Sequence, residues 1–231
     1  MSTAFPFACV LFDLDGTLLN TAPDLTTALN KALAHFGYSE VLASGITPYI
    51  SYGAAVMIET ALASSEQSAS EAQKADILQW LLAYYENNIA VYTHLYDGMV
   101  GLLATLEAQA IPWGVVTNKR ERLTHPLMQA LNLTQRSACI ICGDTTAHSK
   151  PHPEPMLAAC QQIQVSPDSC LYIGDAQHDI SAGIAANMHT LAATWGYLKP
   201  DDQPENWGAD ALVHQPSEIL AWINNQSHAL N

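Results

Sequence analysis

The sequence of 231 residues predicts an α/β fold, a Rossmann-like parallel sheet with a helical segment inserted after its first strand. Two observations predict this fold. Short apolar runs alternate with helical patterns, and continuous apolar runs are typical of parallel strands that are buried on both faces. In addition, about a hundred residues separate the first two runs, far more than the ~12 residues that one crossover connection needs.

The strands of the sheet are predicted at six apolar runs. These runs are residues 8–14, 113–117, 139–142, 170–174, 190–194 and, more weakly, 211–214. The third run begins and ends with Cys139 and Cys142, which have the spacing of one half of a metal knuckle. Because no second pair completes such a site, both residues are predicted to be ordinary strand residues. The five cysteines of the chain are expected to be buried thiols.

The inserted segment is predicted to be helical at residues 23–36, 54–63 and 69–92, where apolar positions recur at helical spacing. Thr21 and Pro23 indicate a helix start, and Gly37 indicates the end of that helix. Asp97 and Gly98 indicate the start of the helix that returns to the sheet. The predicted domains are therefore a discontinuous core, residues 1–19 and 93–231, and a helical cap, residues 20–92.

The charge of the chain restricts its partners. It has 22 acidic and 8 basic residues, for a net charge of −14. This balance disfavours nucleic acids and anionic membranes, because both require basic surface. No apolar stretch approaches the ~18 residues of a membrane helix, and the N-terminus lacks the positive charge of a signal peptide. We therefore expect a cytoplasmic protein, a monomer or homodimer, that acts on a small molecule.

Polar side chains follow four of the predicted strands. Since the carboxyl ends of parallel strands meet at one edge of a sheet, we expect these residues to lie together. They are Asp13, Asp15, Gly16 and Thr17 after the first strand, Thr117, Asn118 and Lys119 after the second, Lys150 after the third, and Asp175 and Asp179 after the fourth. Clustered carboxylates repel one another unless a cation joins them, and oxygen ligands suit Mg²⁺. The sequence therefore predicts a Mg²⁺ site at this edge.

Each of these residues also has a plainer interpretation. Asp-x-Asp-Gly alone is a common surface turn, Lys150 alone could be a solvated loop lysine, and Asp179 could be a charge favoured at a helix N-terminus. A surface turn explains neither the apolar strand before Asp13 nor the partners after three other strands. The joint set therefore favours a functional site.

Four motifs resemble those of the haloacid dehalogenase superfamily: Asp13-Leu14-Asp15-Gly16-Thr17-Leu18, Thr117-Asn118, Lys150-Pro151, and Gly174-Asp175 with Asp179. The resemblance covers essentially the whole chain, and the insertion resembles the helical cap of the phosphoglycolate phosphatase branch. It implies a Mg²⁺-dependent phosphomonoesterase. Two alternatives stay open, a phosphomutase of the same superfamily and a phospho-accepting receiver module, although the Gly16-Thr17 turn and the cap disfavour the receiver.

The resemblance also implies roles for the residues. Asp13 is the nucleophile that forms an aspartyl phosphate, and Asp15 is the acid and then the base. Thr117 and Lys150 neutralise the phosphate, while Gly16, Thr17, Asn118 and Lys119 contribute to substrate binding. Mg²⁺ is held by Asp13, Asp15 through its backbone carbonyl, and Asp175, and Asp179 either binds the ion directly or supports its ligands. Asn20 and Ala176 depart from common family patterns.

Four further segments, residues 95–99, 112–119, 126–128 and 207–210, resemble a group of this branch that includes N-acetylmuramic acid 6-phosphate phosphatases. Both this substrate and phosphoglycolate carry a carboxylate, which should meet a cation. The candidate cations are Lys31, Lys119, Arg120 and Arg122. We expect residues 51–54 of the cap to admit the substrate. The neighbouring histidines His148, His152 and His178 are interpreted as ordinary loop residues.

Overall fold

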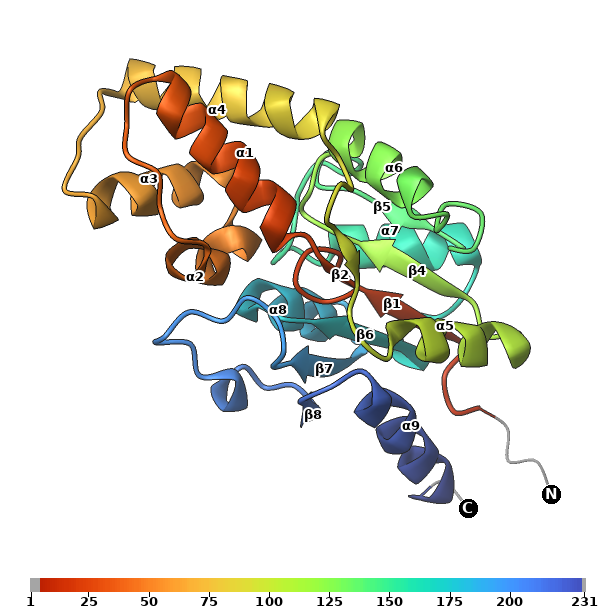
Figure 1. Cartoon of the computed structure of the whole chain (residues 1–231). Coiled ribbons are helices and arrows are strands. Elements are labelled where there is room, and N and C mark those ends of the chain that lie inside the picture. Colours follow the sequence, from red (N-terminus) through yellow and green to blue (C-terminus); the bar gives the residue numbers. More distant parts are fainter. Residues whose placement is uncertain (1–4, 230–231) are drawn as a thin grey trace.

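A computed structural model describes residues 5–229 and contains a six-stranded sheet in the order β5-β4-β1-β6-β7-β8 (Figure 1). The strands are β1 (Cys9–Phe12), β4 (Trp113–Val116), β5 (Ile140–Ile141), β6 (Cys170–Gly174), β7 (His189–Ala193) and β8 (Ala211–Val213). Every neighbouring pair is parallel, which confirms the predicted α/β fold. The chain runs outward from β1 to β5 and then crosses to β6. The carboxyl end of β1 thus lies at the topological switch point, where ligands of such sheets bind.

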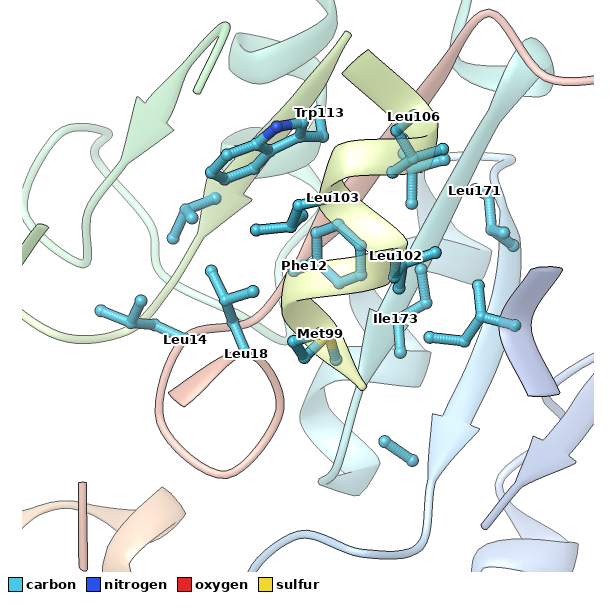
Figure 2. Packing of buried hydrophobic residues seen from close by; sticks show 14 of the residues in the cluster. Phe12, Leu14, Leu18, Met99, Leu102, Leu103, Leu106, Trp113, Leu171 and Ile173 are labelled. Carbon is cyan, nitrogen blue, oxygen red and sulfur yellow. The ribbon is translucent and has the colours of Figure 1, made fainter. Parts of the chain in front are cut away.

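Helices cover both faces of the sheet. On one face lie α5 (Met99–Ala108), α6 (Glu121–Ala130) and α9 (Ser217–Ala229), and on the other lie α7 (Glu154–Ile163) and α8 (Gln177–Ala185). Leu102, Leu103 and Leu106 of α5 pack over Phe12 and Ile173 of the central strands (Figure 2). Each fully buried leucine contributes about 1.5–3 kcal/mol. This packing holds the strand ends, and the residues that follow them, in fixed positions.

The helical insertion lies between β2 (Leu19–Asn20) and β3 (His94–Leu95), which pair antiparallel at its neck. It consists of α1 (Ala22–His35), α2 (Ala43–Ile46), the 3-10 helix η1 (Thr47–Tyr52), α3 (Ala54–Ser64) and α4 (Glu71–Asn87). These helices share an apolar cluster of their own, and they lie beyond the carboxyl end of β1 (Figure 1). Asp24 ties the neck together, because its carboxylate accepts hydrogen bonds from the amides of Tyr92 and Thr93 at 2.9–3.1 Å.

Several predicted elements differ from those observed. The helix predicted to reach residue 92 ends at Asn87, since residues 88–93 return to the neck. The predictions missed α2, η1 and the short β2–β3 ladder. The third strand is shorter than predicted, so Cys139 and Cys142 flank it. Both are buried free thiols, and burial raises the pKa of Cys139 to about 12 and that of Cys142 to about 11. No helix within residues 5–229 has the length and hydrophobicity that a bilayer crossing needs.

Candidate active site

Asp13, Lys150 and Asp179 form a buried ionic cluster behind the end of β1. The Nζ atom of Lys150 donates to Asp13 Oδ1 and to Asp179 Oδ1, each at 2.6 Å. It also lies 2.9 Å from the Val116 carbonyl and 2.8 Å from the Tyr172 hydroxyl. The three charged side chains are only 1%, 7% and 0% exposed for Lys150, Asp13 and Asp179. Lys150 is therefore not a solvated loop lysine, and water does not screen these interactions.

Asp175 lies beside this cluster and is held by residues from distant parts of the chain. Its Oδ1 accepts from the Thr17 hydroxyl at 2.9 Å, and its Oδ2 accepts from the Tyr197 amide at 2.8 Å and the Ser51 hydroxyl at 3.1 Å. A Cβ atom at Gly16 would lie 2.3 Å from the carboxylate. Because Gly16 also has φ +88°, the turn after β1 requires glycine here.

The pKa values of the buried carboxylates reflect their burial first and the charges around them second. Burial raises the pKa of Asp13, and the opposing effect of Lys150 does not cancel this rise. Burial, together with the charge of Asp179, raises the pKa of Asp175 to about 7. Burial alone would also raise the pKa of Asp179, but the Lys150 ammonium, His178 and the Ala176 amide together outweigh burial and lower that pKa. Three carboxylates thus share one ammonium, and a further cation would relieve the repulsion between them.

The same carboxylates lie close enough together to approach the geometry of a Mg²⁺ site. One oxygen from each of Asp13, Asp175 and Asp179 lies within 4.8 Å of the others. Ligands of an octahedral Mg²⁺, each about 2.0–2.1 Å from the ion, lie about 3–4 Å from one another. The donor set, hard carboxylate oxygens with unneutralised charge, therefore fits Mg²⁺.

Asp15 faces a second lysine. The Nζ atom of Lys119 donates to its two carboxylate oxygens at 3.0 and 3.2 Å, and the Thr21 hydroxyl donates to Oδ1 at 2.6 Å. Burial by itself lowers the pKa of Lys119, but the adjacent Asp15 carboxylate and the Tyr85 hydroxyl together raise it by more. Tyr85 of α4 covers this pair, with its ring centroid 4.7 Å from the ammonium. The insertion therefore contacts the core next to Asp15.

Thr117 and Asn118 organise the neighbouring loops. The Asn118 side chain accepts a hydrogen bond from the Lys150 amide and donates one to the Lys150 carbonyl, both at 3.0 Å. The Thr117 hydroxyl accepts from the Lys119 amide at 3.1 Å. These bonds fix the backbone of both lysines relative to the end of β4.

A cavity of about 670 Å³ separates the sheet edge from the insertion. From the sheet edge it is lined by Asp13, Asp15, Thr117, Asn118 and Lys119. From the insertion it is lined by an apolar group that includes Ile50, Met57, Leu78 and Leu82, together with Ser51 and Tyr52. Gly16, Thr17, Lys150, Asp175 and Asp179 are buried and are not among the residues that line the cavity.

The candidate cations differ in their relation to the cavity. Lys119, Arg120 and Arg122 line it, whereas Lys31 is not part of its described lining. Of the three histidines, His178 lines the cavity, and burial lowers its pKa. His148 and His152 lie outside this cavity, in a separate surface hollow.

Tyr197 is a residue that the sequence analysis missed. Its hydroxyl accepts from the amides of Thr21 and Ala22 at 2.7 and 2.9 Å, so it caps the start of α1. Thr21, the expected cap, uses its hydroxyl for Asp15 instead. Asn20 takes part as well, because its Oδ1 accepts from the Tyr197 hydroxyl at 3.1 Å. The position of Tyr197 just after a predicted strand, at the same sheet edge, is the signal that could have found it.

Tyr52 also joins the insertion to the core and was not assigned a contact from sequence. Its hydroxyl lies 3.4 Å from both carboxylate oxygens of Asp202, and Lys199 Nζ lies 4.1 Å from its ring centroid. The ring of His178 packs edge-on against it, with centroids 6.1 Å apart. The expected entrance loop, residues 51–54, thus rests directly on the site.

Comparisons with known proteins agree with this geometry. A family model described as haloacid dehalogenase-like hydrolase matches residues 10–193. N-acetylmuramic acid 6-phosphate phosphatase of Pseudomonas putida is 43% identical over 217 residues, 94% of this chain and 96% of that protein. Phosphoglycolate phosphatase of Xanthomonas campestris is 41% identical over 221 residues, 94% and 98% of the two chains. The crystal structure of a predicted phosphoglycolate phosphatase from Haemophilus somnus has a TM-score of 0.84 at 27% identity, covering 94% and 98%.

Proposed function

The chain belongs to the haloacid dehalogenase-like hydrolase family, as a phosphatase, and we propose that it hydrolyses a small phosphomonoester through a phosphorylated Asp13. One observation carries this proposal. Asp13 and Asp15 are the two carboxylates that face the cavity, and Asp13 is paired with Lys150 on its buried side. Such a pairing orients the carboxylate toward the cavity, and the Lys150 ammonium opposes the rise that burial causes in the pKa of the Asp13 nucleophile.

The reaction has two half-reactions. In the first, an Asp13 carboxylate oxygen attacks phosphorus, the bond from phosphorus to the substrate oxygen breaks, and Asp15 supplies the proton to the leaving oxygen. In the second, Asp15 takes a proton from a water molecule that attacks the aspartyl phosphate, which releases phosphate and regenerates Asp13. Thr117 and the Lys119 ammonium, both on the cavity wall, stabilise the charged phosphoryl oxygens.

Asp13, the Asp15 backbone carbonyl and Asp175 would hold Mg²⁺, with Asp179 at the same centre. When bound, the ion supplies charge neutralisation between the anionic nucleophile and the anionic phosphate. Thr17, Ser51 and the Tyr197 amide orient Asp175 for this role. Residues 20–92 act as a cap domain that excludes water from the reacting groups, and residues 1–19 and 93–231 form the catalytic core.

The cavity favours N-acetylmuramic acid 6-phosphate over phosphoglycolate as the substrate. Its volume of about 670 Å³ is in the range of sites that bury a molecule much larger than phosphoglycolate. Its insertion wall is apolar, which suits the methyl groups of the acetyl and lactyl substituents. Arg120 and Arg122 lie on the same lining, where either can pair with the lactyl carboxylate.

The test is release of inorganic phosphate from a panel of phosphomonoesters with Mg²⁺, for the wild type, Asp13→Asn and Asp15→Asn. The panel should contain N-acetylmuramic acid 6-phosphate, phosphoglycolate and a neutral sugar phosphate. We expect turnover by the wild type, fastest on the first, and loss with both variants. Full activity of either variant would refute the mechanism.

The panel also separates the alternatives. A phosphomutase would convert one sugar phosphate into an isomer with little release of phosphate, which product chromatography detects. A receiver module would become stably phosphorylated from acetyl phosphate and turn over no member of the panel. Preference for phosphoglycolate over the muramic acid ester would leave the phosphatase proposal intact but overturn the choice of substrate.

A further inference from the structure

The loop that carries Lys150 presents a second group of metal-ligating side chains on its outer side. His148 and His152 lie two residues before and two residues after Lys150, and Glu154 begins α7. The side chain of Lys150 is 1% exposed, whereas those of His148, His152 and Glu154 are 63%, 50% and 37% exposed. One loop thus places Lys150 against Asp13 on its inner side and presents His148, His152 and Glu154 to solvent on its outer side.

The outer group is already close to the geometry of a metal site. One nitrogen of each histidine and one oxygen of Glu154 lie within 4.8 Å of one another. Glu154 Oε2 is 2.8 Å from His148 Nδ1 and 3.9 Å from His152 Nδ1. In a tetrahedral Zn²⁺ site with bonds of about 2.0–2.1 Å, neighbouring ligand atoms are about 3.3 Å apart. Shifts of about half an ångström would bring the Glu154 oxygen to this spacing from both nitrogens, and the two nitrogens lie within 4.8 Å of each other.

The surroundings leave room for an ion and water. His148, Ser149, Pro151 and His152 line an open surface hollow of about 590 Å³. The two imidazole rings are stacked, with centroids 4.4 Å apart and an interplanar angle of 29°. Nothing in the hydrolysis of a phosphomonoester uses this hollow, which is separate from the cavity that Asp13 and Asp15 line.

A structural role is the competing explanation. Glu154 Oε2 accepts from the His148 amide at 3.1 Å, and the Glu154 amide donates to His152 Nδ1 at 3.2 Å. These bonds alone could tie the loop to α7. Only the second bond uses a ring: a metal ion at His152 Nδ1 would replace the Glu154 amide there, whereas the His148 amide would keep its bond to the Glu154 carboxylate.

We propose that His148, His152 and Glu154 bind a divalent transition-metal ion of the Zn²⁺ class. Two imidazoles and one carboxylate favour Zn²⁺ over Mg²⁺, which prefers an all-oxygen set such as the carboxylates of the catalytic centre. The bound ion joins the residues on both sides of Lys150 to the start of α7. It therefore restrains the loop that positions this lysine against Asp13.

The experiment is a calorimetric titration of the full chain, without a histidine tag, with Zn²⁺ in excess Mg²⁺. The wild type is expected to bind one Zn²⁺ that Mg²⁺ does not displace. His148→Ala, His152→Ala and Glu154→Gln should each weaken binding at least about tenfold, since even partners outside the ligand shell affect affinity by 10–100-fold. His189→Ala is the matched control. His189 is exposed and lies 3.3 Å from a single carboxylate, that of Asp210, so its loss should leave the affinity unchanged.

A second readout separates binding from a nonspecific effect. Zn²⁺ should slow amide hydrogen exchange at residues 147–153 in the wild type and not in the His148→Ala/His152→Ala double variant. Retention of Mg²⁺-dependent activity would show that this variant is folded. The proposal is overturned if the wild type binds no Zn²⁺ under these conditions, or if the double variant binds it as tightly as the wild type.

Discussion

The two walls of the cavity are built on different physical principles. On the sheet edge, charged groups are held by several partners each. Lys150 alone contacts Asp13, Asp179, Val116 and Tyr172 at 2.6–2.9 Å. On the insertion wall, side chains such as Ile50, Met57 and Leu78 make van der Waals contacts. Only a few polar groups of the insertion, among them Ser51, reach a charged residue of the sheet edge.

This difference separates the residues proposed to carry out the reaction from those proposed to select the substrate. Removing one member of a buried ionic network leaves the others uncompensated, so the sheet edge cannot change by single steps. An apolar wall tolerates exchange of one hydrophobic side chain for another of similar volume at a cost below about 1.5 kcal/mol. The insertion can therefore change its fit to a substrate while the charged edge stays constant.

Lys150→Met should have the largest effect. It leaves Asp13 and Asp179 buried without a cation, which should cost about 3–5 kcal/mol of unfolding free energy in EDTA. It should also reduce kcat about 100-fold, because Asp13 loses the ammonium that orients its carboxylate toward the cavity, and misplacement of a reacting group can cost that much. Urea unfolding and phosphate release measure the two effects.

Lys74→Met is the matched control for this substitution. Its ammonium lies 2.8 Å from Glu71 on the surface of α4, and the side chains are 29% and 89% exposed. Exposed ion pairs contribute about 0–1 kcal/mol, so this variant should be almost as stable as the wild type and fully active. Equal losses of stability in the two variants would contradict the contrast between buried edge and exposed surface.

Asp175→Asn tests the charge excess through pH. The folded-state pKa of Asp175 is about 7, above its ordinary value of 3.8, so between these values the folded protein holds a proton that the unfolded chain has released. The metal-free wild type should therefore lose stability as pH rises through this window. One pKa unit corresponds to about 1.4 kcal/mol, so the full effect is a few kcal/mol.

In EDTA, Asp175→Asn should be more stable than the wild type at pH 8, and the difference should vanish near pH 4. Mg²⁺ should stabilise the wild type more at pH 8 than at pH 6, and the variant little at either pH. Urea unfolding at these pH values, with and without Mg²⁺, measures this. If the wild type remains more stable than the variant at pH 8 without Mg²⁺, the hydrogen bonds from Thr17, Ser51 and Tyr197 are sufficient to stabilise the buried negative charge of Asp175.

The same contrast explains what the sequence could predict. Asp13, Thr117, Lys150 and Asp175 were predictable because each follows an apolar strand, and parallel strands bring their carboxyl ends to one edge. Their grouping follows from topology and needs no knowledge of side-chain packing. The excess of carboxylates over lysines at that edge likewise indicated a metal site before the distances were known.

Contacts between the insertion and the core were not predictable in this way. Ser51 is 124 positions from Asp175, and the Tyr197 hydroxyl caps a helix that begins 175 positions earlier. Periodicity and capping rules describe neighbours within one element, and they assigned the cap of α1 to Thr21. The hydroxyl of Thr21 instead lies 2.6 Å from Asp15, because the active site offers it a charged partner.

Arg120→Gln and Arg122→Gln test selection at the cavity. Loss of the arginine that pairs with the substrate carboxylate should raise KM for N-acetylmuramic acid 6-phosphate about 10- to 100-fold, equivalent to about 1.5–3 kcal/mol for a hydrogen bond to a charged group. KM for a neutral sugar phosphate and kcat should change little. Lys31→Gln is the control, since Lys31 is not part of the described lining. Equal changes for carboxylated and neutral substrates in both arginine variants would exclude this role.

Tyr85→Phe should have the smallest effect, although Tyr85 is the part of the insertion that covers Asp15 and Lys119. It is 1% exposed, and its hydroxyl has no hydrogen-bond partner of ordinary length within residues 5–229, although it lies close enough to the Lys119 ammonium to help raise the pKa of that lysine. A buried hydroxyl without a partner costs about 1–3 kcal/mol, so its removal should leave stability unchanged or raise it by up to about 1 kcal/mol. The phenyl ring keeps the contact with the Lys119 ammonium, and kcat should stay within about twofold of the wild type.

Tyr85→Leu provides the comparison within the same position, because it removes the ring as well as the hydroxyl. It should destabilise the protein, since the cation–π contact and part of the packing are lost together. Thermal unfolding and kinetics of both variants separate the two contributions. A tenfold or greater loss of kcat in Tyr85→Phe with normal stability would mean that the hydroxyl contacts Lys119 or Asp15 during turnover. In that case, the insertion would contribute to the reaction as well as to selection.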